Sequence, residues 1–285
     1  MRAAGFASAL ALLAATPAAA GPVQDRIYPA PTAPLSLAGL PEGAALAEVR
    51  TADGLLLKGV ALRAKAGMPT LLVLHGNGSS AADAVRWLAP LAAAGYGIIA
   101  AEYRGYSGIP GRPDEKGLAA DADAFLVLAR AQAGEGPVWA FGHSLGGGVA
   151  MSLALRGRVD ALVTVGAFTR LRAMAPPLAR AFVPDAYDNL AQVPRLATPW
   201  ILVHGSADAT VPLTEARALH QAAGAAHRNG GAFVLMDSDH KPDAALLLAV
   251  CNAARAWLKD RRWPLSDIPA SAKLLPFGVT KPLNP

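Results

Sequence analysis

Short apolar runs alternate with longer helical patterns along this chain, and this alternation constrains its fold more than any other feature. Strand-like runs occupy residues 45–50, 55–64, 70–75, 97–103, 137–143, 161–167, 200–205 and 232–237. Helical patterns occupy residues 79–94, 115–132, 145–157, 212–224 and 242–260. Asp53-Gly54 joins the first two runs and predicts an antiparallel hairpin. The later strand-helix alternation predicts right-handed crossovers and a parallel sheet covered on both faces. We therefore expect one doubly wound α/β domain over residues 42–260, with about eight mostly parallel strands.

The two ends of the chain differ from this domain. Residues 1–20 combine Arg2, a short apolar stretch and a small-residue end, which predicts a cleaved secretory signal and an exported protein, periplasmic or secreted. Residues 21–41 are rich in Pro and Ala and predict an extended lead-in. Residues 261–285 are rich in Pro and predict a tail draped on the surface. The one cysteine, Cys251, lies on an apolar helical face, so a buried and unreactive thiol is expected.

The composition excludes several classes of function. The net charge of +5 comes from scattered Lys and Arg without a basic run, which argues against a nucleic-acid-binding protein. No later apolar stretch has the roughly 20 residues that a membrane span needs. The sequence also has no His-Glu-x-x-His pattern, no cysteine pair and no phosphate-binding loop, so we expect neither a metal nor an organic cofactor.

One motif predicts nucleophilic chemistry. Residues 142–146 match the pattern G-x-S-x-G, and they lie between an apolar strand and a small-residue helix. That context is typical of a nucleophile elbow, in which the serine sits on a strained turn and flanking glycines let the neighbouring backbone pass. Ser144 is therefore the candidate nucleophile. The structural alternative is a serine that only caps the following helix.

A serine nucleophile needs a base and an orienting acid, and in this topology they follow in the order Ser, Asp or Glu, His. Asp208 lies in the loop after the strand at 200–205, and His240 lies in the loop after the last strand. Carboxyl ends of parallel strands meet at one edge of the sheet. Ser144, Asp208 and His240 are thus expected to converge as nucleophile, acid and base.

The other histidines are expected to serve the structure. His220 and His227 fall in or after the helix before the last strand, and we expect both to be exposed. His204 lies in a strand end, where it is expected to pack or to hydrogen-bond a loop. The side chain of His143 is expected to point away from Ser144 along the turn.

Four other aspartates compete with Asp208 or neighbour the candidate base. Asp185 and Asp188 follow the strand at which some hydrolases keep their acid, and they stay open as alternatives. Asp237 and Asp239 precede the candidate base and are expected to shape its turn.

Acyl transfer also needs hydrogen-bond donors for the developing oxyanion. The amide of Leu145, directly after the nucleophile, is one candidate. The second is the amide of Asn77, which lies in a turn after the strand that ends at His75-Gly76. We expect His75 to fix this loop.

With these residues in place, the chain resembles the α/β-hydrolase superfamily from about residue 45 to residue 258. The resemblance rests on "LHGNGSSAAD", "AEYRGYSGIPGRPDEKGLAADADAFL", "GHSLGGGVA", "VGAFTRLRAMA" and "HGSADATVP". These segments are similar to the serine-hydrolase branch that includes animal membrane-associated depalmitoylases and many bacterial esterase-like or peptidase-like proteins. The resemblance implies Ser144 as nucleophile, Asp208 as acid and His240 as base. The N-terminal cysteine cluster of the depalmitoylases is absent, so their membrane attachment and substrate do not carry over.

The segment 169–198 is too short for a large lipase lid and predicts a short helical cap. Met174, Leu178, Phe182 and Val183 are its candidate acyl-pocket residues, with core packing as the alternative. The sequence predicts a serine hydrolase that cleaves a carboxylic ester or thioester through an acyl-enzyme. A peptidase or amidase of the same fold is the first alternative, and a non-catalytic binding protein that has kept the fold is the second.

Overall fold

The computed structural model describes residues 25, 27–175, 177–183, 187–226 and 229–278 of the chain. Within these residues, nine strands form one sheet in the order β1-β2-β4-β3-β5-β6-β7-β8-β9. The strands are β1 (Ala45–Arg50), β2 (Leu56–Leu62), β3 (Thr70–Leu74), β4 (Gly97–Ala101), β5 (Val138–His143), β6 (Ala161–Val165), β7 (Trp200–Gly205), β8 (Gly230–Leu235) and β9 (Ala272–Pro276). The predicted α/β-hydrolase architecture and all eight predicted strands are confirmed.

The pairing of the strands also follows the prediction for the central sheet. β1 and β2 form the antiparallel hairpin, and β2 pairs antiparallel with β4. β3 to β8 are parallel to one another. The chain passes from β3 to β4 on one side and then returns to place β5 on the other side of β3. The carboxyl ends of β3 and β5 therefore flank a topological switch point, where open α/β sheets bind their ligands.

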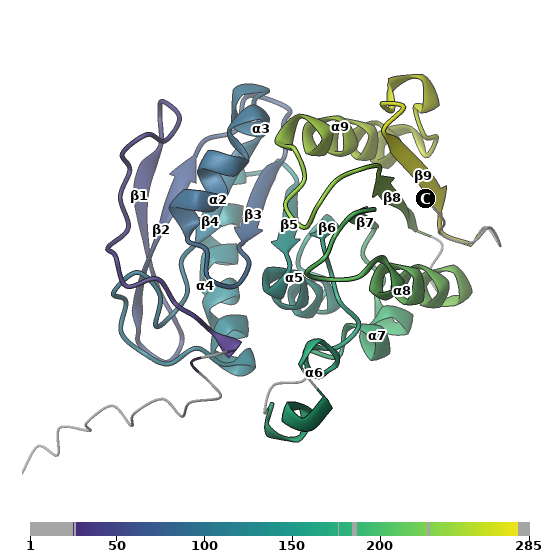
Figure 1. Cartoon of the computed structure of the whole chain (residues 1–285). Coiled ribbons are helices and arrows are strands. Elements are labelled where there is room, and N and C mark those ends of the chain that lie inside the picture. Colours follow the sequence, from purple (N-terminus) through teal and green to yellow (C-terminus); the bar gives the residue numbers. More distant parts are fainter. Residues whose placement is uncertain (1–24, 26, 176, 184–186, 227–228, 279–285) are drawn as a thin grey trace, which may run out of the picture.

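Helices cover both faces of the sheet (Figure 1). One face packs against α4 (Glu115–Ala133), α5 (Leu145–Leu155) and α8 (Leu213–Ala226). The other face packs against α2 (Ala81–Trp87), α3 (Ala89–Ala93) and α9 (Ala244–Asp260). Side chains of β3 alternate between the two cores: Leu72 and Leu74 face the first, and Leu71 and Val73 face the second. Burial on both faces explains why the central strands are continuously apolar rather than alternating.

The expectation of a draped tail after residue 260 is wrong for residues 272–276. These residues form β9, which pairs antiparallel with β8 at the edge of the sheet. Pro276 ends this strand, and an edge position tolerates a proline because one side of the strand needs no ladder partner. The short 3-10 helix η3 (Leu265–Asp267) lies between α9 and β9.

Short helical segments follow β6 in place of a long excursion. They are α6 (Leu171–Met174), the 3-10 helix η1 (Pro177–Phe182), α7 (Asn189–Gln192) and the 3-10 helix η2 (Val193–Arg195). α7 contacts both α5 and α8, so this segment lies against the helices of the first face. The predicted signal segment 1–20 lies outside the described residues.

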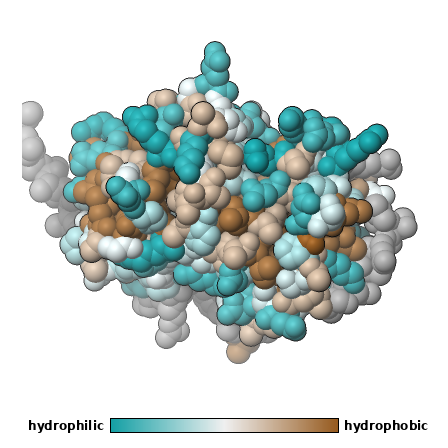
Figure 2. Space-filling view, turned by 90° about the horizontal axis from the view of Figure 1, so that it is seen from above, coloured by the Kyte–Doolittle hydropathy of each residue, from teal (hydrophilic) through white to brown (hydrophobic). Residues whose placement is uncertain are grey.

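Hydrophilic and apolar residues are interspersed on the face seen from above the view of Figure 1 (Figure 2). None of the helices in the described part of the chain has the length and apolar character needed to cross a membrane. Cys251 is buried as expected, and this burial raises the pKa of its thiol to about 12.

Candidate active site

Ser144 occupies the turn between β5 and α5. Its backbone has φ 52° and ψ −118°, a conformation that residues other than glycine rarely adopt. The Ser144 amide donates to the carbonyl oxygen of Val165 at 2.9 Å, and its carbonyl accepts from the Gly147 amide at 2.8 Å. Two backbone hydrogen bonds thus hold the serine on the strained strand-turn-helix connection that the motif predicts.

Gly142 and Gly146 allow this turn to form. A Cβ atom on Gly142 would collide with the backbone carbonyl of Gly146, and one on Gly146 would collide with the carbonyl oxygens of Leu74 and His75. The start of α5 therefore packs directly against the carboxyl end of β3. This contact places Ser144 beside the loop that follows β3.

Asp208 and His240 are hydrogen-bonded. The imidazole Nδ1 of His240 donates to Oδ2 of Asp208 at 2.8 Å, and the carboxylate is inaccessible to solvent. Burial disfavours ionisation of Asp208, but the bonds from His240 and from the Val211 amide outweigh it and lower the pKa of the carboxyl. A proton on Nδ1 leaves Nε2 of His240 as the basic atom.

The loop around Asp208 has its own fixed geometry. Oδ1 of Asp208 accepts from the amides of Thr210 at 2.9 Å and Val211 at 2.8 Å. Nε2 of His204 donates to the Val211 carbonyl at 2.8 Å and lies 3.5 Å from Oδ2 of Asp208. The expectation that His204 hydrogen-bonds a loop is confirmed, and this bond closes the loop that presents the acid.

A cavity of about 410 Å³ lies between the loops after β3, β5, β7 and β8. It is lined by Val73, His75, Gly76, Asn77, Gly78, Ser79, Asp83, Ala84, Trp87, His143, Ser144, Thr210, His240 and Lys241. The structure therefore brings Ser144, His240 and Asn77 to one cavity, with Asp208 directly behind His240. Leu145 follows the serine as the first residue of α5, and its amide is among those that have no acceptor within the helix.

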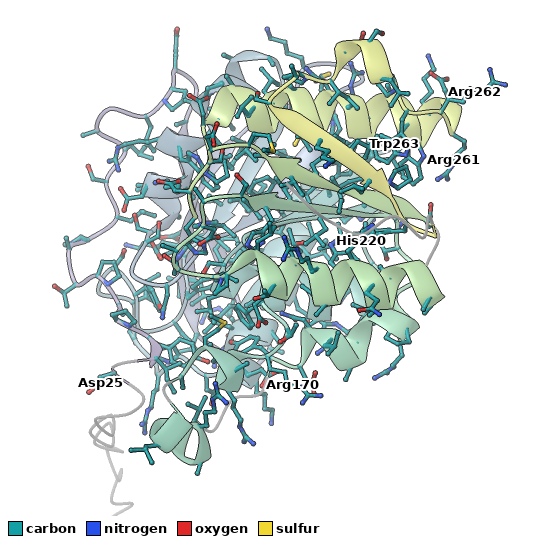
Figure 3. All side chains as sticks on the ribbon, turned by 45° about the vertical axis from the view of Figure 1, so that its right-hand side comes forward. Asp25, Arg170, His220, Arg261, Arg262 and Trp263 are labelled. Carbon is teal, nitrogen blue, oxygen red and sulfur yellow. The ribbon has the colours of Figure 1, made fainter. Side chains whose placement is uncertain are left out.

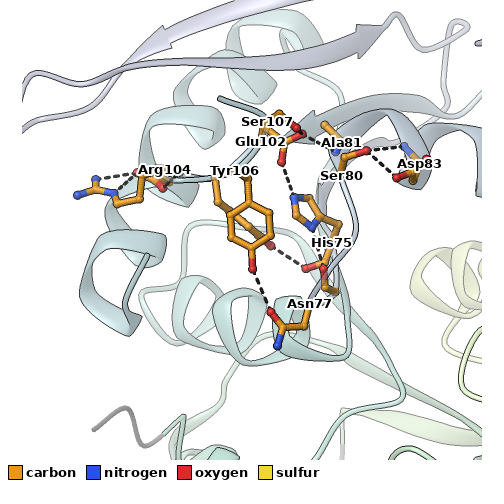
Figure 4. A network of polar contacts seen from close by, with 12 residues as sticks. His75, Asn77, Ser80, Ala81, Asp83, Glu102, Arg104, Tyr106 and Ser107 are labelled. Atoms are coloured by element: carbon orange, nitrogen blue, oxygen red, sulfur yellow. Dashed lines mark hydrogen bonds and ion pairs between the residues drawn. The ribbon is translucent and has the colours of Figure 1, made fainter. Parts of the chain in front are cut away.

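Side-chain contacts fix the loop that carries Asn77 (Figure 4). The side-chain amide of Asn77 donates to the Ile27 carbonyl and its Oδ1 accepts from the Tyr106 hydroxyl at 3.0 Å. The Tyr103 hydroxyl donates to the His75 carbonyl at 3.0 Å. Both tyrosines belong to the segment "AEYRGYSG", so this part of the motif supports the loop of the candidate oxyanion donor.

His75 and Glu102 form a buried pair below the same loop. Nε2 of His75 lies 2.9 Å from Oε1 of Glu102, and Nδ1 lies 2.9 Å from the Gly76 carbonyl oxygen. The Ser107 hydroxyl and the Ala81 amide each donate to Oε2 of Glu102 at 3.0 Å. The predicted loop-fixing role of His75 is confirmed. Glu102 was not predicted, although a carboxylate that ends an apolar strand is a usable signal because a buried charge needs partners.

His143 corrects an expectation. Its side chain lines the cavity instead of pointing away, because Nε2 donates to the His240 carbonyl at 2.9 Å. The centroid of the His143 ring lies 4.8 Å from that of the His240 ring and 4.9 Å from that of the Trp87 ring. Burial is the main cause that lowers the pKa of His143 to about 4, and the nearby His240 contributes to the same shift. A neutral His143 therefore supports the backbone of the candidate base.

The candidate acyl-pocket residues do not meet the cavity at Ser144. Leu178 is 92% exposed, and Met174 packs at the edge of the first core. Neither lines the cavity. Within the cap, α7 lies against α5 and α8, and η2 lies against α8. Val183 is buried, and the side chain of Phe182 lies outside the described residues. Trp87, Thr210 and Lys241 line the cavity and were not predicted.

The remaining alternatives lie elsewhere. Asp188 caps α7 through the Ala191 amide at 3.0 Å and pairs with Arg170 at 2.9 Å. Asp239 accepts from the Lys241 amide at 2.9 Å and shapes the turn as expected. His220, on α8, is buried, which contradicts its expected exposure (Figure 3). Asp185 and His227 lie outside the described residues.

The model of the family described as "alpha/beta hydrolase fold" matches residues 69–196, from the start of β3 through the cap. The chain has the α/β-hydrolase fold. The residues that the family model matches include the loop of Asn77 and the turn of Ser144.

Two individual proteins are similar to this chain in sequence. The uncharacterized protein Rv2307c of Mycobacterium tuberculosis is 34% identical over 185 residues, which cover 61% of the chain and 66% of that protein. The rat lysophosphatidylserine lipase ABHD12 is 29% identical over 182 residues, which cover 54% of the chain and 45% of the lipase. The chain thus spans less than two thirds of each relative.

A solved structure shares the fold. The Pyrococcus furiosus esterase Pf2001 superposes with a TM-score of 0.62 at 19% identity, over 83% of this chain and 97% of the esterase.

Proposed function

We propose that this α/β-hydrolase is a serine hydrolase that cleaves a carboxylic ester or thioester through an acyl-enzyme on Ser144. The observation that carries the proposal is the 2.8 Å bond between His240 Nδ1 and Asp208 beside the cavity that Ser144 lines. The lipase among the relatives and the esterase among the solved structures support ester substrates.

Each candidate residue has a defined part in the proposed reaction. Nε2 of His240 takes the proton of the Ser144 hydroxyl while Oγ attacks the acyl carbon. The amides of Asn77 and Leu145 stabilise the oxyanion, and protonated His240 gives its proton to the leaving oxygen or sulfur. Water, activated by His240, then releases the acid and frees Ser144. Asp208 stays ionised throughout because its pKa is lowered.

The test is hydrolysis of p-nitrophenyl esters of increasing chain length, compared with aminoacyl p-nitroanilides. We expect the esters to be cleaved and Ser144→Ala to lower kcat by at least about 10³-fold. Ester cleavage that survives Ser144→Ala would exclude this serine as nucleophile. Cleavage of the anilides alone would favour the peptidase alternative.

We also propose that the protein is exported from the cytoplasm. Residues 1–20 have the pattern of a secretory signal, and cleavage after Ala20 would release the mature enzyme outside the cytoplasm. Amino-terminal sequencing of the protein recovered from the periplasm or the medium tests this. An intact Met1 in all recovered protein would contradict it.

A further inference from the structure

Lys241 adjoins the candidate base and lines the same cavity as Ser144. Its ammonium lies over the indole of Trp87, 5.5 Å from the ring centroid. Nε1 of Trp87 donates to the Pro242 carbonyl at 2.9 Å, and the Lys241 amide donates to Asp239. These contacts hold both sides of the 240–242 turn, so the place of Lys241 at the cavity is set by the fold.

The charge of Lys241 is not neutralised within the described residues, since no carboxylate oxygen lies within salt-bridge distance of its ammonium. Asp83, the carboxylate in the cavity lining, is already engaged. It pairs with Arg86 at 2.8 Å and accepts from the Ser80 hydroxyl at 2.8 Å. Asp208 is turned toward His240 and is closed to solvent. The cavity therefore offers one uncompensated cation, supplied by Lys241.

Lys241 lies on the side of the cavity where the leaving group of the substrate is expected. This step rests on the proposed function, in which His240 protonates the leaving group. The leaving group must then lie on the His240 side of Ser144. Lys241 follows His240 directly, and Trp87 provides an aromatic surface beneath its ammonium.

We propose that the substrate is an ester whose leaving alcohol carries an anionic group, a carboxylate or a phosphate, and that Lys241 recognises this charge. An ammonium at a partly solvated site attracts a nearby anion by a moderate, salt-sensitive amount. Lys241 is thus a specificity-determining residue that acts on the leaving group and not on the acyl chain.

The experiment uses two pairs of esters that differ in charge on the leaving group. The first pair is the butyrate esters of 3-hydroxybenzoate and 3-hydroxybenzamide, which have similar shapes. The second pair is the octanoate esters of glycerol 3-phosphate and glycerol, used as monomers in solution. We expect kcat/KM to favour the anionic member by about two- to fivefold at low salt, chiefly through KM. This ratio falls as ionic strength rises to about 0.5 M.

Variants assign the preference to Lys241. Lys241→Gln is expected to remove the anionic preference, while Lys241→Arg keeps it because the charge is retained. Lys259→Gln is the matched control, since Lys259 lies on α9 beside a separate cavity near Pro69 and Pro137 and is expected to keep the full preference. A preference in the phosphate pair alone would support the proposal with phosphate as the recognised group.

Other outcomes overturn the inference. Equal hydrolysis of both members of both pairs would do so and leave the proposed function standing. A preference for the anionic ester that persists in Lys241→Gln would also overturn it, because a group other than Lys241 would then bind the negative charge. Absence of ester hydrolysis together with absence of covalent labelling of Ser144 would remove the proposed function, and this inference with it.

Discussion

Acidification is expected to destabilise the folded protein through protonation of His143. Burial and the neighbouring His240 lower the pKa of His143 from 6.5 to about 4. Between these two values the unfolded chain binds more protons than the folded one, so the free energy of unfolding falls as pH decreases. Each tenfold change in an equilibrium constant is worth about 1.4 kcal/mol, so the full loss from His143 is about 3 kcal/mol at pH 4 and below.

The measurement is urea unfolding at several pH values between about 7 and 4, for the unmodified protein and for His143→Gln. The lowered pKa values of buried His204 and His220 add slopes of the same sign, so the difference between the two proteins isolates His143. The lowered pKa of Asp208 adds a loss of the same sign only near the lower end of this range, as pH approaches the ordinary value of 3.8, and both proteins share this loss. We expect the variant to have a clearly shallower dependence on pH. Parallel curves for the two proteins would refute the assignment.

Three further substitutions test separate parts of the structure. Asp208→Asn is expected to lower kcat by about 10³- to 10⁴-fold in the ester assay, because a side-chain amide favours the wrong imidazole tautomer, whereas an unchanged kcat would rule out Asp208 as the acid. Gly146→Ala is expected to abolish folding or to cost several kcal/mol in denaturant unfolding, since its Cβ would overlap the Leu74 carbonyl; native-like stability would contradict this close approach. Arg104→Met leaves the buried carboxylate of Asp121 without its ion-pair partner, so a loss of about 3–5 kcal/mol is expected, and a loss below about 1 kcal/mol would show that the pair is dispensable.

The central sheet could be predicted because the sequence patterns that specify it, apolar runs and helical periodicity, are local. Apolar runs that are buried on both faces, separated by helical patterns, admit few arrangements besides a parallel sheet. That arrangement sends the loops after β5, β7 and β8 to one edge. The contact between Asp208 and His240 therefore follows from strand order, although 32 positions separate the two residues.

Features that depend on long-range contacts were not predictable in this way. β9 is short and ends at a proline, and only pairing with β8 makes it a strand. His143 turns into the cavity because its Nε2 donates a hydrogen bond to the His240 carbonyl, a contact between loops that are distant in sequence. Met174 and Leu178 were expected at the cavity from their apolar character, but apolar character does not determine which way a cap segment faces.

Covalent labelling tests the central claim most directly. The mature protein is treated with a fluorophosphonate, and the modified residue is located by peptide mass spectrometry. A serine hydrolase of the proposed mechanism is labelled once, on Ser144, and the label is absent from Ser144→Ala and strongly slowed in His240→Ala. Labelling of a different residue, or no labelling of folded protein, would contradict the assignment of Ser144 as the nucleophile.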